Sequence, residues 1–189
     1  MDNPTLFLGD RVRLIAEDPS TFGEAFARWS RDSEFSRLLD NAPAHLWSAR
    51  QVKGWLEEDA EKDPPPEYFF AIHALDSQRL IGFAVLMQIS WNNGDCMVAI
   101  GIGERELWGK GYGTDAMKLI LRYAFNELNL HRVTLGVFEY NLRAIRSYEK
   151  VGFKVEGCIR KQLNREGKRW NLIHMGMLRT EWEQIQAAG

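Results

Sequence analysis

The sequence predicts an α/β (α+β) protein with a mixed, mostly antiparallel central sheet of about seven strands and helices on both faces. The order of elements leads to this prediction, because amphipathic helices and hairpins precede a strand–helix–strand–helix run and a closing hairpin. No repeat, low-complexity tract or linker interrupts the order, so we expect residues 1–189 to form one domain. The expected strands cover residues 11–15, 68–75, 80–90, 96–103, 132–138, 153–162 and 170–178.

The first helix is expected after the segment Glu17-Asp18-Pro19-Ser20, which ends the first strand and can begin a helix. Phe22, Phe26 and Trp29 would then lie along one side of that helix. Residues 31–47 have a mixed pattern that predicts no regular element.

A second helix is expected from Ser48, a favourable N-cap residue, to about residue 61. The run Asp63-Pro64-Pro65-Pro66 should end it, because proline supplies no amide donor and fixes the backbone. The residues expected to face inward are Val52, Leu56 and Trp55.

Turn signals separate the elements of the second half. Residues 76–78 and 91–95 should join the middle strands into hairpins, and residues 164–167 should join the last two strands. A long helix is expected from about Gly111 to Leu128, and a short one from Leu142 to Lys150. The long helix would turn Ala116, Leu119, Ile120, Tyr123, Ala124 and Leu128 inward.

The composition is that of a soluble globular protein, with 45% hydrophobic residues, 26% charged residues and a net charge of −2. Without a basic field, a nucleic-acid partner is not expected. Residues 1–5 lack the pattern of a signal peptide, and no apolar run reaches the length of a membrane span, so we expect no membrane attachment and a cytoplasmic location. Cys96 and Cys158 are expected to be free thiols, and the scattered histidines predict no metal site.

The segment Trp108-Gly109-Lys110-Gly111-Tyr112-Gly113-Thr114 predicts a loop that holds a pyrophosphate. The first turn of a helix has amides without intrahelical acceptors, and glycines let a bulky anion approach the backbone. Thr114 would add a hydroxyl, and Lys110 would add charge unless it is simply solvated.

The loop has three alternative interpretations. The first is a strand-to-helix turn without a ligand. The second is a dinucleotide or methyl-donor fingerprint, which Glu139 at the end of the next strand favours. The position of the loop after antiparallel hairpins, with little chain left to complete a parallel sheet, argues against it. The third, a P-loop, is excluded because Lys110 is followed by Gly111 rather than by Ser or Thr.

A second segment, Asn141 to Phe153, contains Tyr148-Glu149-Lys150 followed by Gly152-Phe153. With this segment and the glycine loop, the chain resembles the GNAT acetyltransferase superfamily, especially its ribosomal-protein N-terminal and spermidine/spermine acetyltransferase branch. The resemblance extends from about Ala99 to Trp182, and the part before it matches only in outline. The further matching motifs are Ile100-Gly101-Ile102, Leu130-His131-Arg132-Val133, Glu156-Gly157 and Met175-Gly176-Met177-Leu178.

The resemblance implies acetyl-CoA as donor, direct transfer to an amine, and no metal. Pyrophosphate would bind the amides of residues 109–114, and the pantetheine arm would pair with the strand at Ile100–Gly103. Arg143 and Arg146 would approach the phosphates or remain solvated, and Trp108 replaces the Gln or Arg common in the family. The implied cofactor-binding residues are Ile100, Gly101, Ile102, Gly103, Trp108, Gly109, Lys110, Gly111, Tyr112, Gly113, Thr114, Asn141, Arg143 and Arg146.

Tyr148 is the implied catalytic residue, because a neutral phenol near the sulfur can act as a general acid toward the leaving thiolate. Many relatives carry a Glu as base on the strand before the loop, but Ala99 occupies that place here. Deprotonating an alkyl amine at pH 7 costs about 4–5 kcal/mol, whereas an α-amine costs only about 1–1.5 kcal/mol. This difference favours a peptide N-terminus as acceptor, or else a chain of water molecules that leads the amine proton to a carboxylate.

Other acceptors and other functions remain open at this stage. A polyamine or an aminoglycoside-type amine is an alternative acceptor, and a non-catalytic acyl-CoA-binding protein of the same fold is an alternative function. Candidate residues for the acceptor pocket are Trp29, Glu34, Phe35, Trp47 and Trp91. By resemblance, the closing strands from Phe153 to Leu178 are expected to help form a homodimer.

Overall fold

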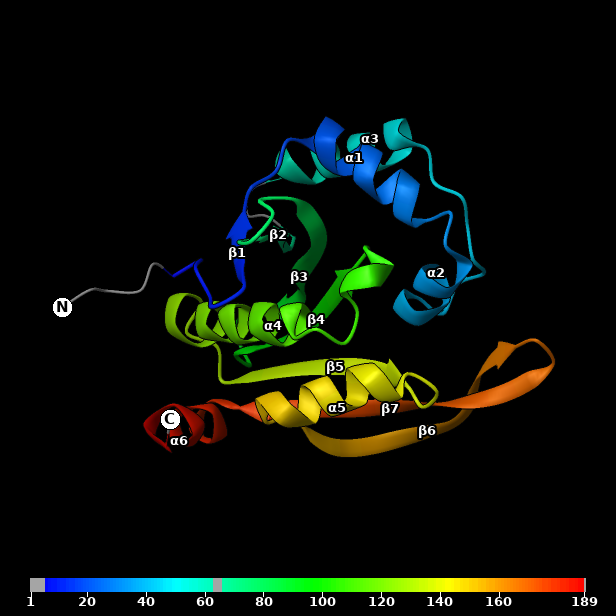
Figure 1. The fold of residues 1–189 in the computed structure, drawn as a ribbon. Coiled ribbons are helices and arrows are strands. Elements are labelled where there is room, and N and C mark those ends of the chain that lie inside the picture. The colour runs from blue at the N-terminus through cyan, green and yellow to red at the C-terminus, as the bar shows by residue number, and fades with distance from the viewer. Residues whose placement is uncertain (1–5, 63–65, 189) are drawn as a thin grey trace.

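The computed structural model describes residues 6–62 and 66–188 (Figure 1). Its seven strands form one sheet in the order β1-β2-β3-β4-β5-β7-β6. Neighbouring strands are antiparallel except for β4 and β5, so the expectation of a mixed, mostly antiparallel sheet is confirmed. The strands are β1 (Val12–Ile15), β2 (Tyr68–Ala74), β3 (Leu80–Ser90), β4 (Asp95–Ile102), β5 (Arg132–Phe138), β6 (Lys154–Arg165) and β7 (Lys168–Leu178).

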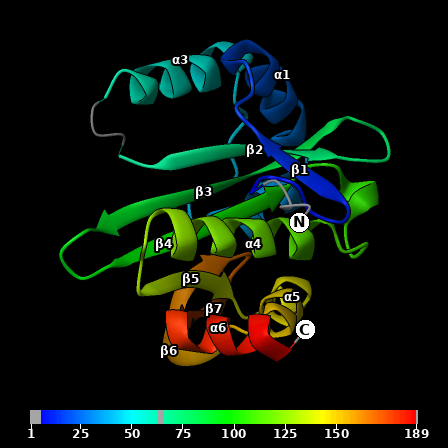
Figure 2. The same ribbon diagram turned by 90° about the vertical axis from the view of Figure 1, so that its left-hand side faces the viewer.

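Helices cover both faces of the sheet (Figures 1 and 2). On one face, α1 and α3 pack on β2 and β3 through an aromatic cluster centred on Phe22 and Phe83. On the other face, α4 and α5 cover the main core, in which Ile120 and Met175 are fully buried. The helices are α1 (Pro19–Trp29), α2 (Ser33–Leu39), α3 (Ala49–Ala60), η1 (Arg105–Leu107), α4 (Tyr112–Arg122), η2 (Tyr123–Glu127), α5 (Leu142–Val151) and α6 (Arg179–Ala188).

The two expected N-terminal helices begin where their capping residues predict. The Asp18 side chain accepts hydrogen bonds from the amides of Ser20 and Thr21 at the start of α1. Ser48 and Gln51 form a capping box at the start of α3. The expectation that Trp55 faces inward is wrong, because its side chain is 44% exposed.

Two helices were not expected from the sequence. The helix α2 lies within residues 31–47, begins at the N-cap Asp32 and buries only Phe35. The helix α6 buries only Trp182. Each is short, with seven and ten residues, and carries too few apolar positions to show the period of a longer amphipathic helix. The run Asp63–Pro65, expected to end α3, and residues 1–5 lie outside the described residues.

The long helix expected over residues 111–128 is divided in the structure. The α-helix α4 passes into the π-helix η2 at Tyr123, and Asn129 follows with a positive φ of 51°. The buried carboxylate of Asp115 accepts hydrogen bonds from the amides of Asp10, Arg11 and Val12. These bonds fix the N-terminal end of α4 against the start of β1.

The closing hairpin is longer than expected. Strands β6 and β7 continue to Arg165 and from Lys168, so only Glu166 and Gly167 form the turn, both with positive φ. The tip of this hairpin extends toward α2 (Figure 1). In the described part of the chain, no helix has the length and apolar character needed to cross a membrane.

Candidate active site

The site begins where the parallel strands β4 and β5 separate. They pair only at Asp95, Cys96 and Met97, although β4 continues to Ile102 and β5 to Phe138. At the point of separation, the Thr134 hydroxyl donates a hydrogen bond to the Cys96 carbonyl at 3.0 Å. Beyond it lies a cleft of about 1070 Å³, whose walls include residues 98–102 of β4 and 136–138 of β5.

The cleft side of β4 presents backbone groups that β5 does not pair. The Gly103 amide donates to the Ile81 carbonyl of β3 at 2.8 Å, so the Ile102 carbonyl in the same trans peptide faces the opposite way, toward the cleft. Because residues alternate along a strand, the N–H and C=O of Ile100 also face the cleft. An extended ligand with amide groups fits this edge as an additional strand.

The N-terminus of α4 lies at the end of this edge. The Asp115 amide donates to the Gly111 carbonyl at 3.0 Å as the first helical hydrogen bond, which leaves the amides of residues 112–114 without intrahelical acceptors. Gly109 and Gly111 have positive φ values of 75° and 92°, which glycine adopts without strain. The Thr114 hydroxyl pairs with that of Ser147 on α5 at 2.7 Å. Free amides and the helix dipole make this turn suitable for an anionic group.

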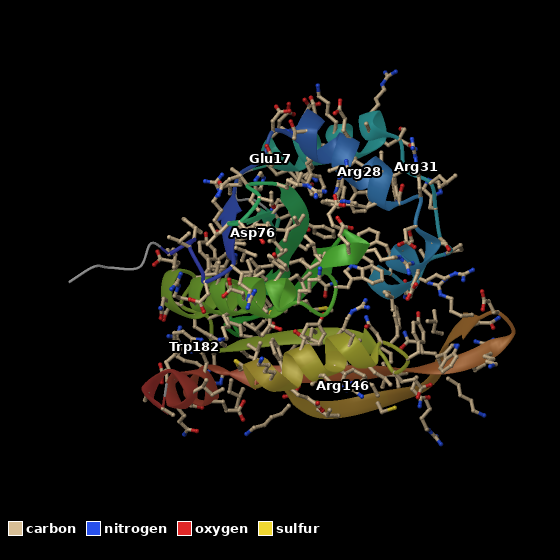
Figure 3. All side chains as sticks on the ribbon, viewed as in Figure 1. Glu17, Arg28, Arg31, Asp76, Arg146 and Trp182 are labelled. Atoms are coloured by element: carbon tan, nitrogen blue, oxygen red, sulfur yellow. The ribbon has the colours of Figure 1, made fainter. Side chains whose placement is uncertain are left out.

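Most of the residues implicated from the sequence come together in the cleft, and three do not. Gly103 packs under the indole of Trp29, where a Cβ would come within 2.0 Å of the ring. The Tyr112 hydroxyl donates to Asp76 in the β2–β3 turn at 2.5 Å, and Lys110 is exposed (Asp76 is labelled in Figure 3). The implicated residues on the cleft wall are Ile100, Gly101, Ile102, Trp108, Gly109, Gly111, Gly113, Thr114, Asn141, Arg143, Arg146 and Tyr148.

The helix α5 supplies the polar side chains of the opposite wall, including Arg146 (Figure 3). The side chain of Asn141 caps α5 by accepting from the Ala144 amide at 3.2 Å. Tyr148 is partly buried, and burial raises its pKa to about 12. In the part of the chain that the structure describes, its hydroxyl has no hydrogen-bond partner. The phenol is therefore protonated at neutral pH and available to a ligand.

At the far end of the cleft, Phe35 is the one lining residue that was a candidate from the sequence, and Trp29, Glu34, Trp47 and Trp91 do not line the cleft. This end lies between the C-terminal end of α2 and the β6–β7 hairpin, which are tied together by side chains. Arg37 pairs with Glu166 at 2.7 Å, and Arg165 donates to the carbonyls of Asp40 and Ala42 at 2.6 and 2.7 Å. Its lining residues are Phe35, Leu38, Leu39, Asp40, Asn41, Gln162, Leu163, Asn164, Arg169 and Leu172. No local sequence signal marks this end as a whole, because its contacts join segments that are distant in the chain. Ser147, which lies beside Tyr148 on the cleft wall, was also not predicted.

Only one carboxylate, Asp40, stands among the described lining residues of the cleft. Ala99, at the position of the family's Glu, also lines it. Glu104, which follows β4 just before the loop, is buried and accepts hydrogen bonds from Arg28 at 2.5 Å and from the Trp29 indole at 3.0 Å. Burial acts to raise the pKa of Glu104, but these donors outweigh it and hold the pKa below its usual value. Glu104 therefore serves the packing of α1 against the loop.

The dinucleotide interpretation does not fit the structure. The carboxylate of Glu139, its proposed ribose-binding acid, accepts from the amide and side chain of Asn171 at 2.7 and 2.8 Å. The described sheet has one parallel pair, β4 and β5, whereas a doubly wound fold is mostly parallel.

A model of the acetyltransferase (GNAT) domain matches residues 11–154. The chain belongs to the GNAT acetyltransferase family. An uncharacterized N-acetyltransferase of Bacillus subtilis, YokL, is 31% identical over 179 residues, covering 95% of this chain and 96% of the relative. The spermidine N(1)-acetyltransferase of Escherichia coli K12 is 38% identical over 154 residues, covering 76% and 79%.

A solved structure, the spermidine N-acetyltransferase of Vibrio cholerae in complex with CoA and spermine, superposes with a TM-score of 0.78 at 21% identity. The superposition covers 91% of this chain and 96% of that one, and it confirms the GNAT fold. This GNAT protein is therefore an acyl-CoA-dependent N-acetyltransferase. Within residues 6–62 and 66–188, no group of three His, Cys, Asp or Glu side chains is placed to hold a metal ion.

Proposed function

We propose that this GNAT protein transfers an acetyl group from acetyl-CoA to the α-amine at the N-terminus of a peptide. The observation that carries the proposal is the chemistry of the acceptor end of the cleft. Its described lining has one carboxylate, Asp40, and one guanidinium, Arg169. The remaining polar side chains there are neutral amides: Asn41, Gln162 and Asn164.

This set of side chains is complementary to a peptide. A peptide N-terminus carries one cationic amine followed by backbone groups that need hydrogen-bond partners, which side-chain amides provide. A polyamine carries several cations, each of which needs a carboxylate or another strong acceptor when it is desolvated. Arg169 would repel such a chain. The phenyl and leucyl side chains of Phe35, Leu38 and Leu39 suit an apolar side chain on the peptide.

The donor end fits acetyl-CoA. The turn at residues 112–114 offers free amides to a pyrophosphate, and the β4 edge at Ile100 offers partners to the amides of pantetheine. In the reaction, the amine nitrogen bonds to the acetyl carbon, the carbon–sulfur bond breaks, and one proton leaves the amine while one ends on sulfur. Backbone N–H groups of β4 near Ile102 would stabilise the carbonyl oxygen.

Tyr148 would donate a hydrogen bond to the sulfur as it leaves. With its pKa raised to about 12, the phenol holds its proton more strongly than a thiol of pKa about 8.5 does. Complete proton transfer to a thiolate is therefore uphill by about 5 kcal/mol, and hydrogen-bond donation is the larger part of its role. The one proton that sulfur needs therefore comes from the amine, either directly or through water.

The absence of a family-type base is consistent with this acceptor. With Ala99 in place of Glu, no carboxylate on β4 can accept the amine proton. An α-amine of pKa near 8 needs only about 1–1.5 kcal/mol to lose its proton at pH 7.

The test is the release of free CoA thiol from acetyl-CoA across a panel of peptides, polyamines and aminoglycosides. The proposal predicts turnover on free N-terminal peptides and none on the same peptides with a blocked N-terminus. Greater turnover on spermidine, or on an alkyl amine, would overturn it.

Spermidine is the second candidate acceptor, because the E. coli relative at 38% identity is named for that substrate. A protein that bound CoA but released no thiol with any acceptor would instead be an acyl-CoA-binding protein of this fold.

For the assembly, we propose a cytoplasmic homodimer without membrane or nucleic-acid partners. The supporting feature is the edge strand β6, on which Val155 and Ile159 are 57% and 46% exposed. Such an edge is suited to pairing with a second copy. Sedimentation at micromolar concentration should show a dimer, and a monomer would refute the proposed homodimer.

A further inference from the structure

Trp108 lies where the cofactor loop, β4 and α5 meet. It lines the cleft and comes directly before Gly109. Its indole Nε1 donates a hydrogen bond to the Ile102 carbonyl at 2.6 Å. That carbonyl faces the cleft, so the indole occupies the last hydrogen-bond position on the free edge of β4. The positions at Ile100 remain open.

Two guanidinium groups lie over the Trp108 ring. Arg143, near the start of α5, lies 4.1 Å from the ring centroid, and Arg105 of η1 lies 4.9 Å from it. A guanidinium within about 6 Å of an indole centroid is attracted to the ring. The ring therefore joins the start of α5 to the segment before the glycine loop.

Arg105 extends these contacts to the acceptor side of the cleft. Its guanidinium donates to both carboxylate oxygens of Asp32 at 2.7 Å and pairs with Glu34 at 2.7 Å. Asp32 caps α2, and Glu34 lies in its first turn. A continuous series of contacts therefore connects α2, which lines the acceptor end, with Trp108, which lines the donor end.

We propose that Trp108 is a positioning residue that sets where pantetheine pairs along β4 and connects the acceptor helix α2 to the cofactor loop. A free Ile102 carbonyl would offer the ligand a second pairing position, one repeat further along the edge. With the indole in place, an extended ligand pairs at Ile100 and must turn into the loop beyond Ile102. The proposal rests on the proposed use of acetyl-CoA by these residues.

The experiment compares Trp108→Leu, Trp108→Phe and the control Trp91→Leu, whose side chain is 54% exposed in the β3–β4 turn. Binding of CoA is measured by titration calorimetry, and KM and kcat are measured with acetyl-CoA and with acetyl-pantetheine, which lacks the pyrophosphate. Trp108→Leu should raise the Kd of CoA and the KM of both donors about tenfold, through loss of one hydrogen bond and two cation–π contacts. Trp108→Phe keeps a ring, so it should raise the Kd of CoA and the KM of both donors only about threefold. The kcat of both variants should be nearly unchanged.

A second variant tests the connection to α2. Arg105→Met leaves every cleft-lining residue in place but removes the bonds to Asp32 and Glu34, and it should raise the Kd of CoA about threefold. Unchanged CoA binding in a folded Trp108→Leu, or in Trp108→Phe if the first variant does not fold, would overturn the positioning role. A loss with acetyl-CoA but not with acetyl-pantetheine would overturn the role in pantetheine pairing. Failure of the wild type to bind CoA would refute the cofactor assignment instead.

Discussion

The proposed donor half and the proposed acceptor half of the cleft are built in different ways. The donor half consists of β4, the loop at residues 108–114 and α5, and it offers chiefly backbone groups from neighbouring parts of the chain. The acceptor half consists of α2, residues 40–41 and the β6–β7 hairpin. It is held by side chains far apart in sequence, such as Arg37 and Glu166, which are 129 positions apart.

This difference indicates which half can change without loss of the reaction. Backbone amides are present whatever the side chains are, so the donor half accommodates Trp108 and Ala99 at positions where the family often has other residues. The acceptor half depends on particular side chains, such as Asp40, and on the contacts that bring two distant segments together. Substitutions in the donor half should therefore affect every acceptor, and those in the acceptor half should change the choice of acceptor.

The largest expected effect is that of Tyr148→Phe. Removal of the phenolic hydroxyl should lower kcat about 10²-fold for every acceptor, because the leaving sulfur loses its hydrogen-bond donor. The Kd of CoA should change little, since the ring and its 6.0 Å contact with Phe153 remain. Steady-state kinetics and calorimetry on the same preparations check this. A loss confined to one acceptor, or a loss explained by KM alone, would contradict a role at the sulfur.

The pH dependence of the rate should separate the two halves. At the acceptor, kcat/KM should rise about tenfold per pH unit and level off near pH 8, the pKa of an α-amine. At the donor, the Tyr148 pKa of about 12 keeps the phenol protonated, so its function is fully present at neutral pH and is lost only as pH rises toward that value. Rate profiles from about pH 6 to about pH 10 should therefore show a plateau without an alkaline decline. A decline near pH 9 that is absent in Tyr148→Phe would show that the phenol ionises much earlier.

The donor half was easier to predict from the sequence than the acceptor half, because its residues are neighbours along the chain. The glycine loop, the segment that begins at Asn141 and the strand at Ile100 are local patterns, and all three line the same cleft. Gly103 and Tyr112 belong to the same segment but serve packing, against Trp29 and Asp76. The sequence pattern alone cannot distinguish residues that line the cleft from neighbouring residues that pack in the core.

The acceptor half was harder to predict, since α2 has only seven residues, too few for Phe35, Leu38 and Leu39 to establish a helical period. The length of the β6–β7 hairpin was also underestimated. Polar residues such as Gln162 and Asn164 give no apolar alternation there, and Lys161 interrupts it with a positive φ of 55°. The contact between these two segments depends on tertiary structure.

The acceptor half is tested most directly by Asp40→Asn. Loss of the only described carboxylate on the cleft wall should raise the KM of a peptide acceptor about tenfold, because the cationic amine loses its charged partner. The side chain also accepts from the Ala42 amide at 2.9 Å, a bond that the Asn oxygen can keep. The Kd of CoA should stay the same, as measured by calorimetry. A tenfold fall in kcat with unchanged KM would instead identify Asp40 as a proton acceptor.

The smallest expected effect is that of the ion pair that closes the acceptor half. Arg37 and Glu166 are 43% and 73% exposed, so their pair should contribute only about 0.2–1 kcal/mol to stability, and less at high salt. A double-mutant cycle with Arg37→Ala and Glu166→Ala, followed by denaturant unfolding and by acceptor KM, measures the coupling. The pair of Lys53 and Glu57 on α3, at 3.6 Å, is the matched control away from the cleft. If the pair holds the hairpin over the acceptor, its loss should raise peptide KM about two- to threefold, whereas loss of the control pair should leave KM unchanged. Equal effects from the two pairs would mean that the Arg165 bonds to Asp40 and Ala42 hold the hairpin by themselves.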